Sequence, residues 1–164
     1  MAAEHKHLII RAEVKKPPID PLWATNWLTH LVKKIGMKIL MGPYATYCDV
    51  PGNAGLTAAV IIETSHIVLH VWDEDQLGEI QFDVYTCSHL DPTDIFKELE
   101  QFDLVKLEYK YFNREKGLIE VDLDDIPFQA NVPNRDTVAA LEDSRAGVVT
   151  PIDSIDSLFG DIHE

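Results

Sequence analysis

The stretch that decides the fold is residues 57–87, which read TAAVIIETSHIVLHVWDEDQLGEIQFDVYTC. Two short runs rich in Ala, Val and Ile, Thr57–Glu63 and His66–Trp72, follow each other closely and predict two strands. A third run, Glu79–Cys87, alternates strictly between apolar and polar residues, as a strand with one packed face does. Its inward face is expected to carry Ile80, Phe82 and Val84, and its outward face Gln81, Asp83, Tyr85 and Cys87.

Two helices flank these strands, and each begins at an Asp-Pro pair. Asp20 and Asp91 are suitable N-caps, and the proline after each suits the first helical position. Further strands are predicted at His7–Val14, Met37–Met41 and Leu104–Phe112, with a loop over 49–55. The order β-α-β-β-β-β-α-β predicts an α+β fold, a two-layer sandwich with a mostly antiparallel sheet and two helices on one face. The other face remains available for a site or a dimer.

Charge is distributed unevenly along the chain of 164 residues, which carries 28 Asp and Glu against 14 Lys and Arg. The last part, 121–164, holds ten of the acidic residues and only two Arg, without a sustained hydrophobic period. We therefore expect a folded domain over 1–120 and a flexible acidic tail over 121–164. The acidic balance argues against nucleic acid and anionic membranes as partners. No secretory or membrane-spanning signal is evident, so a cytoplasmic protein with two reduced cysteines is expected.

An ordered set of short motifs occupies the central stretch. It comprises the dipeptide Ser65-His66, a second histidine at His70, the pattern Trp72-x-Glu74, and Asp83-x-x-Thr86-Cys87. This set resembles the signature of the S-adenosylmethionine decarboxylase family, the prokaryotic-type pyruvoyl enzymes. The resemblance covers roughly residues 5–115, and it implies the fold of that family.

The resemblance implies that the chain cuts itself between Thr64 and Ser65. Ser65 would attack the carbonyl of Thr64, convert the peptide bond to an ester, and become a pyruvoyl group by elimination. His70 would accept a proton during this processing, and the hydroxyl of Thr57 would support it, at a position where the family usually has Ser. Thr64 stands where the family usually has Glu, and its β-branched side chain crowds the carbonyl under attack.

For turnover, the resemblance implies a Schiff base between the pyruvoyl ketone and the amino group of S-adenosylmethionine. Cys87 would return a proton to the decarboxylated product, and Glu74 would hold the ribose hydroxyls. His66 and Trp72 complete the implied substrate-binding set. The product would be the aminopropyl donor for spermidine synthesis, made by a homodimer of cleaved protomers.

The residues themselves add two geometric constraints. Strict alternation puts Ser65 and His70 on opposite faces of a strand, unless Ser65 lies in the turn before it. His66 and His70 share a face, but two residues four apart on a strand lie about 13 Å apart, so they do not share a metal ion. No metal is therefore expected.

Two alternatives remain open at this stage. A sibling enzyme that keeps Ser65, His70 and Cys87 would decarboxylate a smaller amino acid, such as arginine or ornithine. A relative that is never processed would bind and regulate a partner, an interpretation suggested by Thr64.

Overall fold

Seven strands and two helices make up residues 4–122, the part of the chain that the computed structural model describes. In chain order they are β1 (Lys6–Val14), α1 (Pro21–Lys34), β2 (Ile39–Cys48), β3 (Gly55–Ile62), β4 (Ser65–Trp72), β5 (Gly78–Thr86), α2 (Pro92–Leu99), β6 (Leu104–Asn113) and β7 (Ile119–Glu120), with a 3-10 turn at Glu100–Phe102. The acidic tail expected over 121–164 lies outside the described residues from 123 onward. Within 4–122, neither helix is long and apolar enough to cross a membrane.

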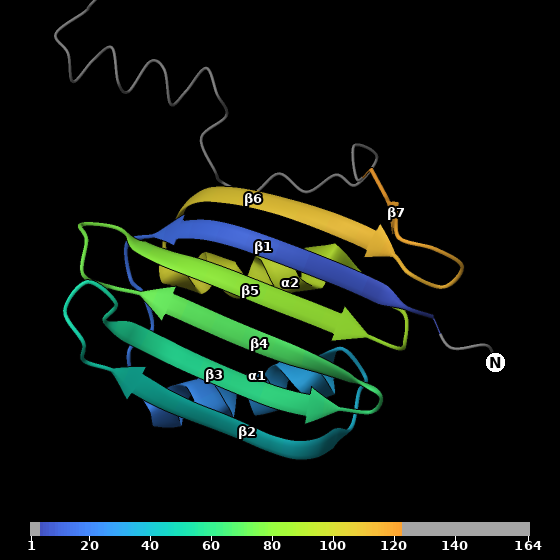
Figure 1. The fold of residues 1–164 in the computed structure, drawn as a ribbon, viewed down its shortest axis with the longest axis horizontal. Helices are drawn as coiled ribbons and strands as arrows, with labels where there is room; N and C mark the ends of the chain where they lie inside the picture. Colours follow the sequence, from blue (N-terminus) through green and yellow to red (C-terminus); the bar gives the residue numbers. More distant parts are fainter. Residues whose placement is uncertain (1–3, 123–164) are drawn as a thin grey trace, which may run out of the picture. The chain divides into compact units, whose positions relative to one another are not determined.

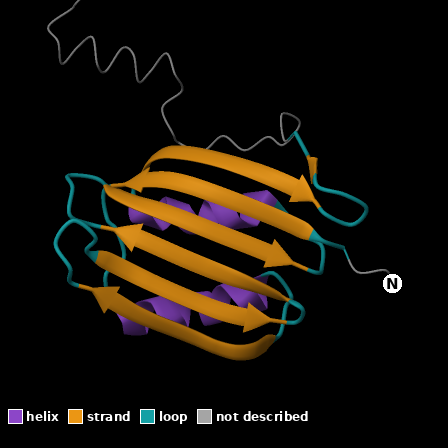
Figure 2. Cartoon of the chain, viewed as in Figure 1, coloured by secondary structure: helices purple, strands orange, loops and turns teal. Residues whose placement is uncertain are grey.

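All strands join one sheet in the order β2-β3-β4-β5-β1-β6-β7, and every neighbouring pair is antiparallel. Both helices lie behind this sheet in Figure 1, and the face toward the viewer has no helix over it. Figure 2 shows the same separation of helices and strands into two layers. The predicted α+β two-layer sandwich is thus confirmed. We call the uncovered side the open face.

Each helix begins directly after the Asp residue that the sequence predicted as its N-cap. The Asp20 carboxylate accepts a hydrogen bond from the Leu22 amide at 2.9 Å, and Asp91 accepts one from the Thr93 amide at 2.9 Å. Both caps satisfy amides that have no partner inside the first helical turn. The two helices are also tied together, because Glu98 of α2 accepts from the Trp27 ring nitrogen and pairs with Lys34 of α1.

The core lies between the helices and the sheet, and alternation along the strands determines which residues enter it. Every second residue of β5 is buried, as predicted, and the intervening residues lie on the open face. The largest fully buried side chains from the sheet and helices include Leu8, Ile10, Leu28, Leu31, Ile67, Leu69, Ile80, Phe82, Ile95 and Phe96. Removal of this apolar surface from water is the main stabilising contribution.

The sequence prediction was wrong at the edge of the sheet. We expected a strand over Met37–Met41, whereas β2 runs from Ile39 to Cys48. The loop expected over 49–55 is present and ends one residue earlier, because β3 begins at Gly55. Strand β2 continues through Gly42-Pro43 because it is an edge strand, where a residue without an amide proton leaves no neighbour unpaired. The short strand β7 was not predicted.

The hairpin of β3 and β4 carries the central motif, and its backbones approach closely at the end away from the turn. Gly55 has a φ of +156°, and a Cβ placed there would lie 1.8 Å from the carbonyl oxygen of Val71. Only glycine fits this position. From there the register runs through the pair Thr57 and His70 to the pair Ile62 and Ser65 beside the turn.

Gly55→Ala is expected to lower the free energy of unfolding by about 3 kcal/mol or more, because a backbone oxygen cannot move aside as a side chain can. Urea unfolding measures the change. Gly36→Ala is the matched control, since Gly36 also has a positive φ, +72°, but open space around the added methyl. It should cost about 1 kcal/mol. Equal losses at both positions would contradict the close approach at Gly55.

Candidate active site

A two-residue turn, Glu63-Thr64, joins β3 to β4. Thr64 has a φ of +54°, in the left-handed region that a β-branched residue rarely adopts. The turn therefore holds its second residue in a strained backbone conformation, of order 1–3 kcal/mol for such outliers. The peptide bond that follows Thr64 is the bond at which the family resemblance implies cleavage.

Ser65 and Cys87 meet at this turn. The Ser65 hydroxyl donates a hydrogen bond to the Glu63 carbonyl oxygen at 3.1 Å, and the Cys87 thiol donates to the same oxygen at 2.8 Å. Ser65 is only 7% exposed, whereas Cys87 is half-buried just beyond the end of β5. The structure thus brings together the predicted nucleophile and the predicted proton donor, which are far apart in sequence.

His70 lies elsewhere, paired with Thr57. Its Nδ1 atom is 3.1 Å from the Thr57 hydroxyl, and the two residues face each other across β3 and β4 on the open face. Ser65 is the first residue of β4 rather than part of the turn, so alternation holds and its side chain points to the buried side. Five residues of extended strand also separate Ser65 from His70 by about 16 Å. Within one chain, the structure does not bring the predicted proton acceptor to the predicted nucleophile.

A hollow of about 430 Å³ lies on the open face across β1, β4 and β5. Its lining is made of Ile9, Ile10, Arg11, His66, Val68, His70, Gln81, Phe82 and Asp83. Two of the predicted site residues, His66 and His70, stand on either side of Val68 in this hollow. Its volume falls in the range of small-molecule sites.

Asp83 lies beside two histidines at the edge of this hollow. Its Oδ1 atom lies 2.8 Å from Nε2 of His7 and 3.3 Å from Nε2 of His66. Burial alone would raise the pKa of the Asp83 carboxyl, but the hydrogen bond from His7 and the proximity of both rings outweigh it, and the pKa is lowered. Asp83 is therefore a firmly ionised acceptor. Arg114 approaches the other ring nitrogen of His7 at 3.3 Å and stacks on the Tyr85 ring.

This cluster is the part of the site that sequence reasoning missed. Asp83 was part of the motif, but no role was assigned to it, and none was assigned to His7 or Arg114. Alternation alone puts His66 and Asp83 on one face. Adding His7 requires knowing that β1 lies beside β5, on the side away from β4, which no local pattern reveals.

Trp72 and Glu74 hold the loop between β2 and β3. The Glu74 carboxylate accepts hydrogen bonds from the Gly52 amide at 2.8 Å and the Ala54 amide at 3.1 Å. The Trp72 ring nitrogen donates to the Asn53 side chain at 2.9 Å, and its ring lies 6.1 Å from that of His70. Both predicted substrate-binding residues therefore stand beside the His70 end of the open face, with Glu74 acting as a clamp on the loop.

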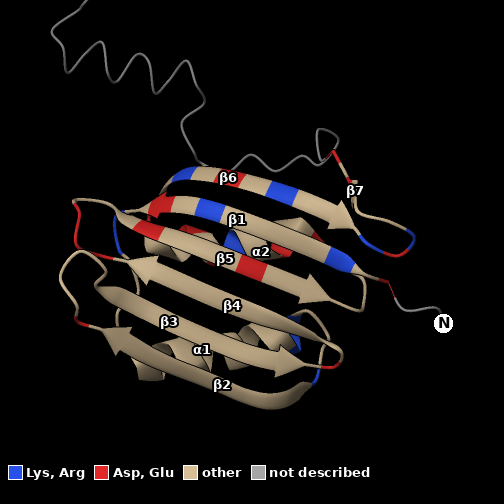
Figure 3. Ribbon diagram, in the orientation of Figure 1, with Lys and Arg blue, Asp and Glu red and all other residues tan. Residues whose placement is uncertain are grey.

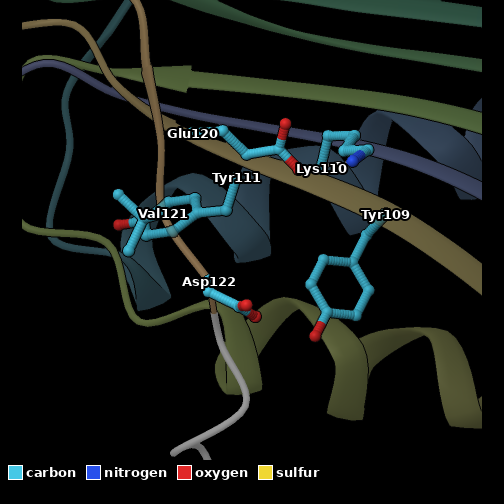
Figure 4. A pocket seen from close by; sticks show the side chains of 6 residues that line it. All are labelled: Tyr109, Lys110, Tyr111, Glu120, Val121 and Asp122. Atoms are coloured by element: carbon cyan, nitrogen blue, oxygen red, sulfur yellow. Dashed lines mark hydrogen bonds and ion pairs between the residues drawn. The ribbon is translucent and has the colours of Figure 1, made fainter.

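A second hollow, of about 490 Å³, lies against β6 and β7. Figure 4 shows its lining, in which Tyr109, Lys110 and Tyr111 of β6 face Glu120, Val121 and Asp122. It contains none of the residues that the motifs single out. Asp122, which lines it, is also the last residue that the structure describes. We therefore place the candidate site at the turn and the open face, where the motif residues lie.

Comparison with known proteins places the chain in a family. The model of the S-adenosylmethionine decarboxylase family matches residues 15–115, which include the hairpin, its turn and Cys87. The chain belongs to the S-adenosylmethionine decarboxylase family. Among its relatives, the S-adenosylmethionine decarboxylase proenzyme of Clostridium botulinum strain Hall is 32% identical over 99 residues, 59% of this chain and 84% of the relative.

Two further members of the S-adenosylmethionine decarboxylase family match over different extents. The proenzyme of Geobacillus kaustophilus is 49% identical over 39 residues, 24% of this chain and 30% of the relative. The crystal structure of the adenosylmethionine decarboxylase from Aquifex aeolicus superposes with a TM-score of 0.48 at 22% identity, covering 74% of this chain and 98% of that one.

Glu74→Ala should release the loop that Glu74 clamps. The amides of Gly52 and Ala54 lose a charged acceptor, so their hydrogen–deuterium exchange should accelerate about tenfold. Exchange resolved by NMR measures both amides. Asp75→Ala, which removes the neighbouring exposed carboxylate, should leave them unchanged. If Glu74→Ala had no effect on either amide, the clamp would not exist in solution.

Proposed function

We propose that this protein is the precursor of a pyruvoyl-dependent decarboxylase that acts on S-adenosylmethionine and supplies the aminopropyl donor for spermidine synthesis. The observation that carries the proposal is the turn. A serine with a buried hydroxyl follows a residue in a strained left-handed conformation, and a thiol is bound to the same carbonyl oxygen. These residues fit the requirements of a self-made pyruvoyl group, which needs a hydroxyl at the scission point and a nearby proton donor.

Processing would begin when the Ser65 Oγ adds to the carbonyl carbon of Thr64. The C–N bond between Thr64 and Ser65 breaks, which leaves an ester and a free amino group and releases the strain of the turn. A base then removes the Cα proton of Ser65, and the Thr64 carboxylate departs as the end of the fragment 1–64. Addition of water and loss of ammonia leave a ketone at the former Cα of residue 65.

The pyruvoyl ketone would supply an electron sink for decarboxylation. The chain's own residues would do the rest. The Cys87 thiol, already at the turn, would donate a proton to the product carbon. The open-face hollow would receive the substrate beside His66, with Trp72 and the loop held by Glu74 at its far end.

We also propose that the active form is a homodimer packed through the open face. Strands β2, β3 and β4 carry no charged residue, and Figure 3 shows Lys, Arg, Asp and Glu on β1, β5 and β6 instead. Met41, Tyr44 and Ile61 stand 48–68% exposed on this uncharged half. Such a patch favours a protein partner.

A dimer of this kind would also supply the missing proton acceptor. A two-fold axis in the interface, midway between Ser65 and His70 along β4, reverses the strand direction of the second copy. It would place the His70 ring of each protomer opposite the Ser65 backbone of the other, whose Cα proton is the one removed in processing, while the Ser65 side chain itself points to the helix side. The Thr57 hydroxyl would come with His70, because the two are hydrogen-bonded.

The denatured mass of the purified protein tests processing. Cleavage between 64 and 65 of this 18.5 kDa chain gives fragments of roughly 7 and 11 kDa, the larger with a ketone in place of its first amino group. Ser65→Ala should give one uncleaved mass and no CO₂ release, whereas the neighbouring Ser88→Ala should cleave normally.

A wild-type chain that stays whole would overturn the enzyme proposal and favour the regulatory binding protein. Cleavage with CO₂ release from arginine or ornithine, but not from S-adenosylmethionine, would establish the sibling decarboxylase instead.

Co-expression of two inactive variants tests the shared site. Ser65→Ala cannot be cut, and His70→Ala should be cut slowly because its proton acceptor is missing. In a mixed dimer the Ser65→Ala chain offers its intact His70 to the Ser65 of the other chain, so cleavage of the His70→Ala chain should be restored. Mass spectrometry of the two differently tagged chains measures this. If His70→Ala is cleaved equally slowly with and without its partner, His70 does not act across a dimer.

A further inference from the structure

Of the two histidines beside Asp83, only His66 has a ring nitrogen without a hydrogen-bond partner among residues 4–122. Nε2 of His66 lies 3.3 Å from an Asp83 carboxylate oxygen, and because a carboxylate only accepts hydrogen bonds, this proximity favours the tautomer with its proton on Nε2. In the neutral ring, the lone pair is then on Nδ1, which has no hydrogen-bond partner among residues 4–122. The side chain is 45% exposed and lines the open-face hollow. Asp83 thus favours the tautomer in which the Nδ1 lone pair of this hollow-lining ring is available.

His7 shares the same carboxylate oxygen but differs in this respect. Its Nε2 donates to Asp83, and its Nδ1 lies 3.3 Å from the Arg114 guanidinium, which can only donate. Both ring nitrogens of His7 therefore have a neighbour. His7 supports Asp83, whereas His66 presents a lone pair.

The chain position of His66 brings it next to the reacting carbon. In the proposed function, the ketone carbon is the former Cα of residue 65, which is about 3.8 Å from the Cα of His66. This carbon belongs to the backbone, so the inward direction of the Ser65 side chain does not turn it away from the open face. His70, about 16 Å along the strand, is not a competitor within the chain.

We propose that His66 is a catalytic proton acceptor in turnover and that Asp83 is its positioning residue. This inference rests on the proposed function and adds a step to it. An amine substrate arrives protonated, and an ammonium nitrogen cannot attack a ketone. His66 Nδ1 takes one proton from the ammonium group, the electron pair of that N–H bond stays on the substrate nitrogen, and the new imidazolium charge faces the Asp83 carboxylate.

Amine capture measured separately from decarboxylation tests this role. Cleaved protein is mixed with S-adenosylmethionine and cyanoborohydride at neutral pH, and the mass gain of the 65–164 fragment is followed in time. His66→Gln keeps a donor for Asp83 but has no basic nitrogen, so capture should slow about 100-fold. Asp83→Asn should slow it about tenfold or more. His89→Gln, which changes an exposed histidine outside the hollow, is the control and should stay within about threefold of wild type.

A second nucleophile separates proton transfer from structural damage. Methoxyamine is a weak base whose nitrogen is already unprotonated at neutral pH, so His66→Gln should capture it at the wild-type rate. Self-cleavage into 1–64 and 65–164 should also be normal, because His66 acts afterwards. Equal slowing with both nucleophiles, or wild-type capture of S-adenosylmethionine by His66→Gln, would overturn the role of His66. A wild-type chain that never cleaves would overturn the proposed function, and this inference with it.

Discussion

The two-residue connection between β3 and β4 is the constraint on which the rest of the site depends. Because antiparallel strands joined so tightly have only one register, Thr57 must face His70 and Ile62 must face Ser65. The same connection forces Thr64 to a φ of +54°. Register, strain and the placement of the predicted nucleophile therefore have one cause, and a longer loop here would loosen all three.

Alternation across the sheet then divides the chemistry between two environments. Ser65 faces the buried side, where a low-polarity environment suits a neutral hydroxyl and thiol that share one carbonyl oxygen. His66 and His70 face the open side, where their rings are accessible and each is held through one nitrogen, by Asp83 and by Thr57. A site that needs both a sheltered nucleophile and accessible bases is served by a sheet that has helices on one face only.

The sequence predicted those features whose determinants are local. The Asp-Pro helix starts, the alternation of β5 and the order of elements all follow from neighbouring residues, and the structure confirms them. The edge strand β2 was predicted too short, and it extends past Gly42-Pro43 because a proline is tolerated at the edge of a sheet. The conformation of Thr64 could not be predicted, because threonine has no intrinsic preference for it. The cluster of His7 and His66 around Asp83 could not be predicted either, since it depends on the insertion of β1 next to β5.

That insertion also determines what holds the protein together after the proposed cut. Residues 1–64 contain β1, α1, β2 and β3, and residues 65–122 contain β4, β5, α2, β6 and β7. Because β1 is paired on both sides, with β5 and with β6, the first fragment is threaded between strands of the second. Separating the fragments would require breaking three strand pairs at once, including the one between β3 and β4. The processed molecule is thus an interlocked two-chain complex, and once unfolded it must reassemble by a bimolecular reaction that the intact precursor never faces.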